Sequence, residues 1–282
     1  MTKKVLIFGA SGWLGRITLN FIKKNGLEFD TTLVASTRKT INNDNYNFTF
    51  ISTDDFRNIK NQSFDYYLNF AFLTQDKLKV INELEYSEKI DEIIKINSDF
   101  FKKNKIQNSL LISSGAVYWK NTPKENLYTL KKLEQEDSFI QNNKNYIIGR
   151  LFGVLGSQYD LISPYAFTSF IKSAKKEKKI KIDSKIKVLR SYLYFENFLD
   201  LFFKDIFYNQ ILDIWDKVFD IYELAKIISE IFDAELVVDS NYFNSEKVDI
   251  YLSSNYNYQT KYGKNISYDE IRKSIFEKNI FY

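Results

Sequence analysis

Val5-Leu6-Ile7-Phe8-Gly9-Ala10-Ser11-Gly12-Trp13-Leu14-Gly15 is the stretch that decides the fold. Its first four residues form a continuous apolar run, which is typical of a parallel strand covered on both faces. After the glycines, apolar residues recur at helical spacing as far as Ile22, and Gly26 can end that helix. A strand, a glycine-rich turn and a helix in this order predict a dinucleotide-binding α/β fold, with the pyrophosphate at the helix N-terminus.

The glycines have the spacing GxxGxxG rather than the GxGxxG of the usual dinucleotide fingerprint. Taken alone, this spacing also fits a glycine-rich turn that binds nothing. Because the turn stands between a strand and a helix, we favour the cofactor site. The residues that we expect to contact the cofactor here are Gly9, Ser11, Gly12, Trp13, Leu14 and Gly15.

Strands and helices alternate through the first half of the chain, which predicts a Rossmann-like, doubly wound parallel sheet. The further strands that we expect are Thr31–Ser36, Phe48–Ser52, Asp65–Ala71, Ser109–Ser113 and Tyr146–Val154. Apolar stripes predict long helices over Ser87–Lys103 and Tyr128–Ile140. Residues 1–160 would form the dinucleotide-binding domain.

The regular alternation of strands and helices changes after Gly156. We expect a smaller C-terminal substrate-binding lobe from residues 161–187 and 219–282, while residues 188–218 return to the first domain. A lysine-rich stretch precedes Arg190, and most of these lysines are expected to be solvated. No internal repeat and no Gly/Ser-rich linker is present.

Composition excludes several classes of chemistry. The chain of 282 residues has neither Cys nor His, which rules out thiolate nucleophiles, a His general base and the usual zinc ligands. We therefore expect no metal site. The net charge of +4 is mild and its cations are spread out, so neither nucleic acid nor a membrane is an expected partner. Gly9 ends the first apolar run too early for a signal peptide, and we expect a cytoplasmic protein.

The end of the second expected strand bears on which dinucleotide binds. NAD-binding proteins have an acidic residue there for the ribose hydroxyls, but this chain has Ser36, Arg38 and Lys39. A hydroxyl and two cations suit a 2′-phosphate, so we expect NADP(H) to be preferred over NAD(H). The alternative is that both cations are ordinary surface charges.

A tyrosine and a lysine provide the expected acid–base chemistry. Tyr128 and Lys132 are four residues apart and therefore share a helix face. A serine-rich segment, Ile112-Ser113-Ser114-Gly115-Ala116-Val117-Tyr118, lies upstream at the end of an expected central strand. The carboxyl edge of such a sheet is where ligands bind.

These segments occur in the order found in the extended short-chain dehydrogenase/reductases, and the chain resembles this NAD-dependent epimerase/dehydratase family over nearly its whole length. Arg150-Leu151-Phe152-Gly153-Val154-Leu155-Gly156 resembles the family's RxFNxxG strand. Arg190-Ser191-Tyr192-Leu193-Tyr194-Phe195-Glu196-Asn197 resembles its RDFIYVDD segment.

The resemblance implies a role for each matching residue. Tyr128 would exchange a proton with a sugar oxygen during hydride transfer, while Lys132 would lower the pKa of Tyr128 and hold the nicotinamide ribose. Ser114 would hydrogen-bond the reacting oxygen, and Asn97 would hold a water of the proton relay. An alternative for Asn97 is a locally satisfied helix asparagine.

The remaining implied contacts are with cofactor and substrate. Asp54 and Ala71 would contact the cofactor, in addition to Tyr128 and Lys132. The residues expected to contact a nucleotide-linked sugar are Ser114, Tyr118, Gly153 and Arg190, the last by clamping its diphosphate.

Departures from the family pattern limit the reaction. Gly153 stands where many members have an Asn that touches the substrate, and the loop between Ser114 and Tyr128 is short. Residues Gly115 and Ala116 replace the Asp-Glu pair that 4,6-dehydratases place after their Ser or Thr. Without that acid and base, dehydration has no catalyst, and we reject it.

We therefore expect NADPH-dependent reduction of a 4-keto group on a nucleotide-activated deoxysugar, in the synthesis of surface-polysaccharide sugars. The alternative is a nucleotide-sugar C4 epimerase with tightly bound NAD. A non-catalytic NADP(H) sensor ranks lower, because such proteins usually lack the Ser/Tyr/Lys set. The resemblance also implies a homodimer formed through the helices Ser87–Lys103 and Tyr128–Ile140.

Overall fold

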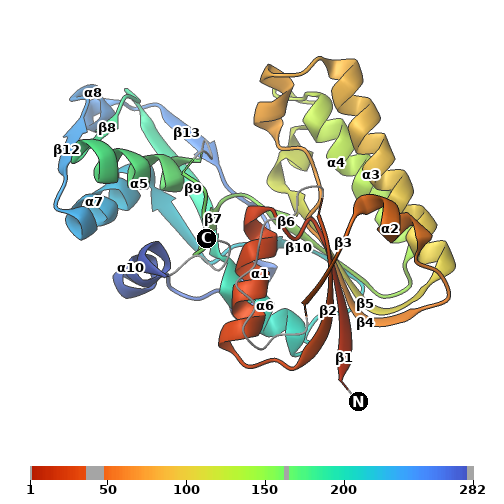
Figure 1. The fold of residues 1–282 in the computed structure, drawn as a ribbon. Coiled ribbons are helices and arrows are strands. Elements are labelled where there is room, and N and C mark those ends of the chain that lie inside the picture. The colour runs from red at the N-terminus through yellow and green to blue at the C-terminus, as the bar shows by residue number, and fades with distance from the viewer. Residues whose placement is uncertain (1, 36–47, 162–164, 278–282) are drawn as a thin grey trace. The chain divides into compact units, whose positions relative to one another are not determined.

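The computed structural model describes residues 2–35, 48–161 and 165–277. The chain divides into two compact units (Figure 1). The first comprises Met1–Arg150 and Leu199–Leu212, and the second comprises Leu151–Phe198 and Asp213–Asn279. The cofactor and substrate roles that the sequence assigns to two domains remain predictions.

A seven-stranded sheet with the order β10-β6-β5-β4-β1-β2-β3 forms the centre of the first unit. Its strands are β1 (Lys3–Phe8), β2 (Phe29–Val34), β3 (Phe48–Ile51), β4 (Ser63–Asn69), β5 (Lys105–Ser114), β6 (Tyr146–Leu151) and β10 (Gln210–Ile214). The pairs β1–β2, β1–β4, β2–β3 and β4–β5 are parallel. The predicted Rossmann-like, doubly wound sheet is confirmed.

The strand order reverses between β1 and β4, since the chain first runs outward through β2 and β3 and then returns beside β1. In open α/β sheets, the crevice at such a switch point is where ligands bind. The two segments at this place are the glycine turn after β1 and residues 70–72 after β4.

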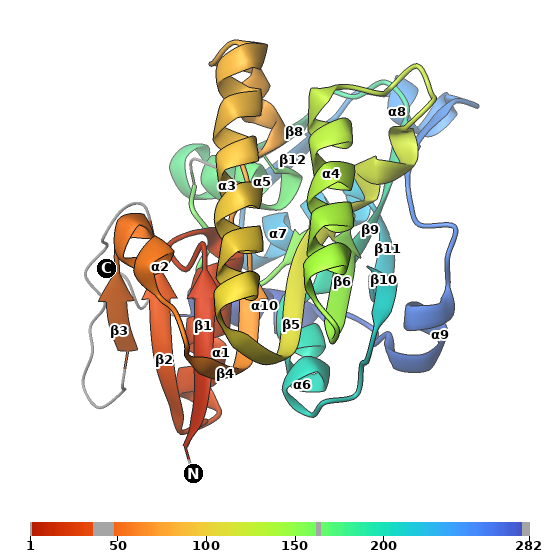
Figure 2. The same cartoon turned by 90° about the vertical axis from the view of Figure 1, so that its right-hand side faces the viewer.

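Helices cover both faces of this sheet (Figure 2). One face carries α2 (Thr53–Asn58), α3 (Glu83–Lys103) and α4 (Leu127–Asn142), and a buried cluster that includes Phe56, Phe100 and Phe139 joins them to the strands. The other face carries α1 (Trp13–Lys24) and α6 (Phe195–Phe203), whose Phe21 and Phe203 rings stack at 6.1 Å. Two short 3₁₀ helices, η1 (Gln75–Lys79) and η2 (Gly115–Trp119), follow β4 and β5.

The second unit contains a four-stranded and a two-stranded sheet. The larger has β9 (Lys187–Tyr194) paired with β7 (Val154–Leu155), β11 (Lys217–Asp220) and β13 (Val248–Tyr251), and the smaller pairs β8 (Lys179–Ile182) with β12 (Glu235–Val238). Its helices are α5 (Ala166–Glu177), α7 (Ile221–Phe232), α8 (Asn241–Asn244), α9 (Asn257–Tyr262) and α10 (Tyr268–Phe276).

The single strand predicted over Tyr146–Val154 is wrong, because the chain breaks it in two. β6 ends at Leu151, and β7 pairs with β9 in the second unit. Gly153 lies at the break, where an added Cβ would come 2.9 Å from both the Ser191 carbonyl oxygen and the Tyr192 ring. This close backbone approach also explains why the chain has a glycine here rather than an asparagine.

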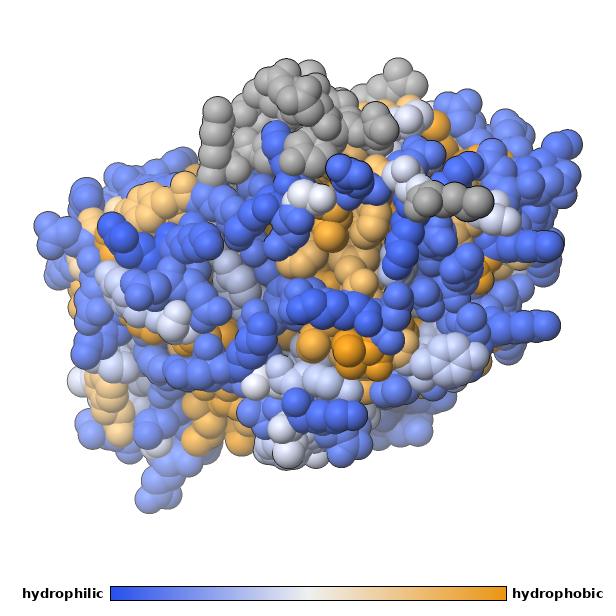
Figure 3. Space-filling view, turned by 90° about the horizontal axis from the view of Figure 1, so that it is seen from below, coloured by the Kyte–Doolittle hydropathy of each residue, from blue (hydrophilic) through white to orange (hydrophobic). Residues whose placement is uncertain are grey.

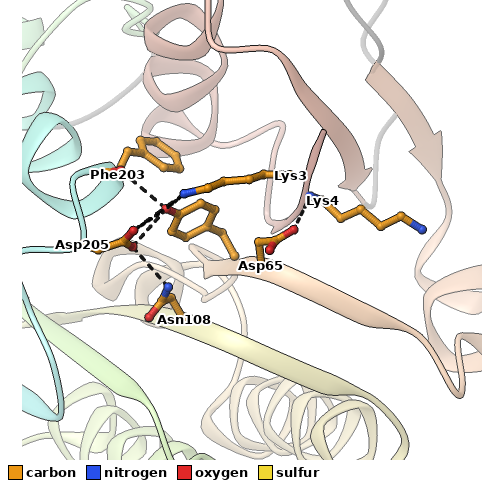
Figure 4. Close-up of polar contacts among 7 residues, drawn as sticks. Lys3, Lys4, Asp65, Asn108, Phe203 and Asp205 are labelled. Atoms are coloured by element: carbon orange, nitrogen blue, oxygen red, sulfur yellow. Dashed lines mark hydrogen bonds and ion pairs between the residues drawn. The ribbon is translucent and has the colours of Figure 1, made fainter. Parts of the chain in front are cut away.

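A polar cluster joins the amino ends of the central strands to the segment after α6 (Figure 4). The Tyr66 hydroxyl accepts from Lys3 Nζ at 2.7 Å and donates to the Asp205 carboxylate at 3.0 Å. Asn108 Nδ2 donates to the same carboxylate at 3.2 Å. Burial raises the pKa of Tyr66, so the hydroxyl stays protonated and keeps its donor role. The cluster lies at the edge opposite the glycine turn and stabilises the sheet.

Replacement of Tyr66 by Phe is expected to lower the free energy of unfolding by about 1 to 2 kcal/mol, because Lys3 and Asp205 lose their shared partner. The ring itself would keep its packing against Phe203, whose centroid lies 5.3 Å away. Urea denaturation measures the change. Asp65→Ala is the control, since the hydrogen bond that Asp65 accepts from the Lys4 amide is exposed, and it should change little; equal losses in both variants would contradict the assignment.

The face of the molecule drawn in Figure 3 is mostly hydrophilic, with hydrophobic side chains in separate patches. Within the described residues, no helix is both long enough and apolar enough to cross a membrane.

Candidate functional site

The turn after β1 has the backbone geometry that its glycines permit. Gly9 has φ +84°, a conformation that side chains disfavour. The Gly9 and Ala10 amides both donate to the Val34 carbonyl oxygen, at 3.0 and 3.2 Å. Buried Arg16, which the sequence analysis missed, donates from Nη1 to the Ser11 carbonyl oxygen at 2.8 Å. The turn is thus held by its hydrogen bonds to β2 and by the hydrogen bond from Arg16 on α1.

The three glycines differ in what surrounds them. A Cβ on Gly9 would lie 2.7 Å from the Ala71 amide nitrogen, and one on Gly15 would lie 2.5 Å from the Ala10 carbonyl oxygen. Among the described residues, a Cβ on Gly12 would meet one atom, the Gly9 carbonyl oxygen, at 3.3 Å. The protein's own packing therefore requires Gly9 and Gly15, whereas Gly12 leaves space at the surface of the turn.

The start of α1 suits an anion. Gly12 is its N-cap and makes no side-chain capping bond, and no acidic residue lies in its first turn, which begins with Trp13 and Leu14. Helix N-termini with uncapped amides favour negative charge. Together with the space beside Gly12, these features fit the pyrophosphate of a dinucleotide.

The end of β4 lies against the glycine turn, as the closeness of Gly9 to Ala71 shows. Asn69 Oδ1 accepts from the Ala71 amide at 3.0 Å, and Asn69 Nδ2 donates to Asn97 Oδ1 at 3.1 Å. The Asn97 amide donates to the Ile93 carbonyl oxygen at 2.7 Å, and its oxygen also accepts from the Tyr67 hydroxyl. Asn97 therefore connects α3 to the end of β4, and a role in a proton relay stays a prediction.

The helix α4 holds both Tyr128 and Lys132. Asn126 caps it by accepting from the Thr129 amide at 3.1 Å. The half-buried Tyr128 ring meets the Phe72 ring edge-to-face at 5.7 Å. The same Phe72 ring lies 3.7 Å from Lys132 Nζ. One aromatic side chain from the segment after β4 thus contacts both expected catalytic residues.

Lys132 is 4% exposed, and its ammonium donates to the Ile112 carbonyl oxygen and to Gln135 Oε1, each at 3.2 Å. Burial lowers the pKa of Lys132 to about 7, against an opposing effect of Glu136. Glu136 is itself paired with Arg150, whose Nε and Nη2 donate to its carboxylate at 3.0 and 2.6 Å. A lysine with this pKa gains and loses its proton near neutral pH.

Replacement of Lys132 by Met is expected to increase stability most at acidic pH. The folded pKa of about 7 lies below the ordinary 10.5, so between these values the unfolded chain binds a proton that the folded chain does not. The contribution of Lys132 to the unfolding free energy therefore rises with pH across this window. In this window, the difference in unfolding free energy between the Lys132→Met variant and the wild-type protein should decrease by about 1.4 kcal/mol per pH unit. Urea denaturation over a pH series tests this, and a constant difference would refute it.

Ser114 ends β5 and is 9% exposed. Its Oγ accepts from the Ala116 amide at 3.2 Å and caps η2. Tyr118, near the far end of η2, is 46% exposed, and its hydroxyl accepts from Arg150 Nη1 at 3.2 Å. The first unit thus contains Ser114, Tyr128, Lys132 and the glycine turn at or near the carboxyl edge of its sheet.

The remaining residues that the sequence analysis expects to contact the cofactor are one aspartate and three residues after β2. Asp54 is exposed in the first turn of α2, where its carboxylate lies 4.0 Å from Arg57 Nη1. Ser36, Arg38 and Lys39 lie outside the described residues. Their part in cofactor choice stays a prediction.

Arg190 lies on β9 in the second unit. Its Nη1 donates to the Leu189 and Asp249 carbonyl oxygens at 2.9 and 3.0 Å, and its Nη2 donates to the Asp249 carboxylate at 2.6 Å. Within the described part of the chain, the Nε–H group has no acceptor. Nε and the remaining Nη2 proton form the edge of a guanidinium that binds oxyanions bidentately.

Sequence reasoning missed several residues that contact the expected site residues, namely Arg16, Asn69, Phe72, Gln135 and the Glu136–Arg150 pair. Asn69 and Gln135 could have been found, because one ends a central strand and the other follows Lys132 by one helical turn. Phe72 had no such indication. Among the described residues, no group of three or more acidic side chains could hold a metal ion.

A glycine turn at the switch point of a parallel sheet is the arrangement typical of dinucleotide-binding α/β folds, and here a buried lysine follows a tyrosine by one helical turn. The chain belongs to the NAD dependent epimerase/dehydratase family, whose model matches residues 5–204. The predicted family is thereby confirmed. No curated protein matches the chain.

Solved structures share the fold over nearly the whole chain. A UDP-N-acetylglucosamine 4-epimerase from Methanobrevibacter ruminantium, in complex with UDP-N-acetylmuramic acid, is 22% identical with a TM-score of 0.75, covering 99% of this chain and 97% of its own. A UDP-glucose 4-epimerase from Thermotoga maritima, with UDP-glucose, is 14% identical with a TM-score of 0.73, covering 96% and 97%. A mutant UDP-glucuronic acid 4-epimerase from Bacillus cereus, in complex with a fluorinated UDP-sugar and NAD, is 15% identical with a TM-score of 0.66, covering 96% and 98%. At these identities, the similarity establishes the fold.

Proposed function

We propose that this protein is an NADPH-dependent reductase of a 4-keto group on a nucleotide-activated deoxysugar, acting in the cytoplasm in the synthesis of surface-polysaccharide sugars. The observation that carries the oxidoreductase proposal is the buried Lys132 one turn after Tyr128, joined to it through Phe72. A structural lysine would rarely be buried here without a carboxylate in direct contact.

Each of the expected site residues of the first unit would have its own role in the reaction. Bound nicotinamide supplies the hydride. Tyr128 donates the proton to the sugar oxygen, Ser114 hydrogen-bonds that oxygen, and the Lys132 ammonium makes the Tyr128 hydroxyl more acidic by stabilising its phenolate. The Gly12 turn and the N-terminus of α1 would hold the pyrophosphate.

The preference for NADP(H) rests on Ser36, Arg38 and Lys39, which replace the acidic residue of NAD-binding proteins. A reductase consumes reduced cofactor in each turnover, and NADPH is the usual donor for such reductions. The absence of an Asp-Glu pair after Ser114 argues against dehydration, since η2 begins with Gly115 and Ala116.

The second candidate is a nucleotide-sugar C4 epimerase with tightly bound NAD. It is favoured by the names of the similar solved structures, several of which are 4-epimerases, one of them with NAD. A non-catalytic NADP(H) sensor ranks lower, because the Ser114, Tyr128 and Lys132 set is complete.

Arg190 would bind the diphosphate of the substrate through its Nε edge. Arg190→Met is expected to raise KM for the nucleotide sugar about tenfold to a hundredfold, since it removes charged hydrogen bonds, with little effect on cofactor binding. Lys181→Met is the control, because Lys181 is exposed and paired with Asp183 in the same unit. An unchanged KM in the Arg190 variant would remove this arginine from the substrate site.

The partner that we propose besides the substrate is a second copy of the chain. α3 and α4 lie side by side on one face of the first unit (Figure 2). They carry the exposed Leu84 and Leu130, so a homodimer through these helices would cover apolar surface. Size-exclusion chromatography with light scattering tests this state.

The experiment that tests the function follows NADPH fluorescence, with NADH in parallel, as the protein meets a panel of nucleotide-linked 4-keto-6-deoxysugars. Stoichiometric loss of NADPH with one sugar would identify a reductase and its substrate. No consumption, together with NAD⁺ released on denaturation, would replace the reductase by the epimerase.

A further inference from the structure

Gln135 occupies a buried position one turn after Lys132 on α4 and is 3% exposed. Its Oε1 accepts from Lys132 Nζ at 3.2 Å, and its Nε2 donates to the Ala71 carbonyl oxygen at 3.3 Å. Since a lysine ammonium only donates and a carbonyl oxygen only accepts, the two contacts leave one possible orientation of the amide.

The surroundings of Lys132 show what this amide contributes. A buried ammonium needs acceptors for its protons. The described contacts of Nζ are the Ile112 carbonyl oxygen, Gln135 Oε1 and the face of Phe72. Of these three, Gln135 is the only group whose polar atom a side-chain substitution can remove.

The second contact of Gln135 leads to the cofactor turn. Ala71, whose carbonyl oxygen Gln135 holds, lies against Gly9 so closely that a Cβ on Gly9 would be 2.7 Å from the Ala71 nitrogen. The Ala71 amide is also held by the Asn69 side chain. Gln135 therefore connects the lysine of α4 to the backbone segment that packs against the glycine turn.

We propose that Gln135 is a positioning residue, which holds the Lys132 ammonium in its catalytic place and couples it to the segment Asn69–Phe72. This inference deepens the proposed function and rests on it. The charged group with an effect on Lys132 is Glu136, on the same helix and already paired with Arg150. Three uncharged residues also face Lys132 or Gln135, namely Ile112 on β5 and Ala71 and Phe72 in the segment after β4.

A double-mutant cycle between Gln135→Met and Lys132→Met tests the coupling without any need for activity. Methionine keeps the volume of glutamine approximately but has no amide. If Gln135 stabilises the charged lysine, Gln135→Met should change the unfolding equilibrium constant more in the wild-type protein than in the Lys132→Met variant. We expect the two changes to differ about fivefold or more. The coupling should be larger well below pH 7 than well above it, because Lys132 loses its charge as the pH rises through its pKa. Additive effects at every pH would overturn the proposal.

The second measurement is steady-state turnover. Gln135→Met should lower kcat about tenfold to a hundredfold with a much smaller change in the KM of the nucleotide sugar. Gln135→Glu keeps an acceptor for Lys132 and should retain more of kcat than the methionine variant. Ser138→Ala is the control, since Ser138 follows Gln135 on α4 and its side chain makes no described contact with Lys132. An unchanged kcat in Gln135→Met would overturn the proposal.

The experiments distinguish a failure of the proposed function from a failure of the Gln135 proposal. If the wild-type protein turns over no nucleotide sugar, the reductase and epimerase proposals fail, and the catalytic part of the Gln135 proposal falls with them. The mutant cycle would still show whether Gln135 supports Lys132.

Discussion

Tyr128→Phe is expected to lower turnover about a hundredfold to ten-thousandfold, the range that general acid–base groups contribute. Phenylalanine keeps the ring and its edge-to-face contact with Phe72, but it has no proton to give. The dissociation constant of the dinucleotide should change much less than turnover, because Tyr128 is only one of the expected cofactor contacts and the variant keeps its ring and the whole glycine turn. Steady-state kinetics and cofactor fluorescence titration measure the two effects separately.

Tyr208→Phe is the matched control, since Tyr208 is 61% exposed and belongs to no part of the site. It should behave as the wild-type protein. If Tyr128→Phe kept full turnover, another group would have to supply the proton, and with no histidine or cysteine in the chain the choice would fall on a carboxylate, a lysine or another tyrosine. If the wild-type protein binds dinucleotide without turnover, the sensor becomes the preferred function.

The central sheet could be predicted because its inner strands, such as β1, are largely buried and therefore contain apolar runs. Val5–Phe8 is almost wholly buried, and its run ends at the glycine turn. The small strands of the second unit, such as β12 and β13, have no such pattern. They are partly exposed and only four residues long, so their pairing depends on partners distant in the sequence.

The site could be predicted only as far as its motifs are local. Tyr128 and Lys132 are related by helical spacing, and Gly9 to Gly15 by a single turn. The contact of Lys132 with Phe72 and that of Gln135 with Ala71 join segments about sixty residues apart, and no spacing in the sequence indicates them. The same is true of Asn97, whose oxygen meets Tyr67 and Asn69.

Gly15→Ala is expected to abolish dinucleotide binding and to destabilise the first unit. Its Cβ would lie 2.5 and 2.6 Å from the Ala10 and Gly9 carbonyl oxygens, both backbone atoms, so either α1 or the turn must move. Overpacking of this kind typically costs about 1 to 3 kcal/mol. Urea denaturation and NADPH fluorescence titration should therefore both report a loss.

Gly12→Ala tests the affinity for the cofactor separately from the stability of the fold. Gly12 has extended backbone angles that alanine adopts. Within the part of the chain that the structure describes, an added Cβ would meet one atom, the Gly9 carbonyl oxygen, at 3.3 Å. Stability should then remain within about 0.5 kcal/mol of the wild-type value, while affinity for NADP(H) falls at least about tenfold, because the methyl group would occupy the space for the pyrophosphate. If this variant bound the dinucleotide as tightly as the wild-type protein, the pyrophosphate could not lie against Gly12, and the glycine turn would be a feature of the fold alone.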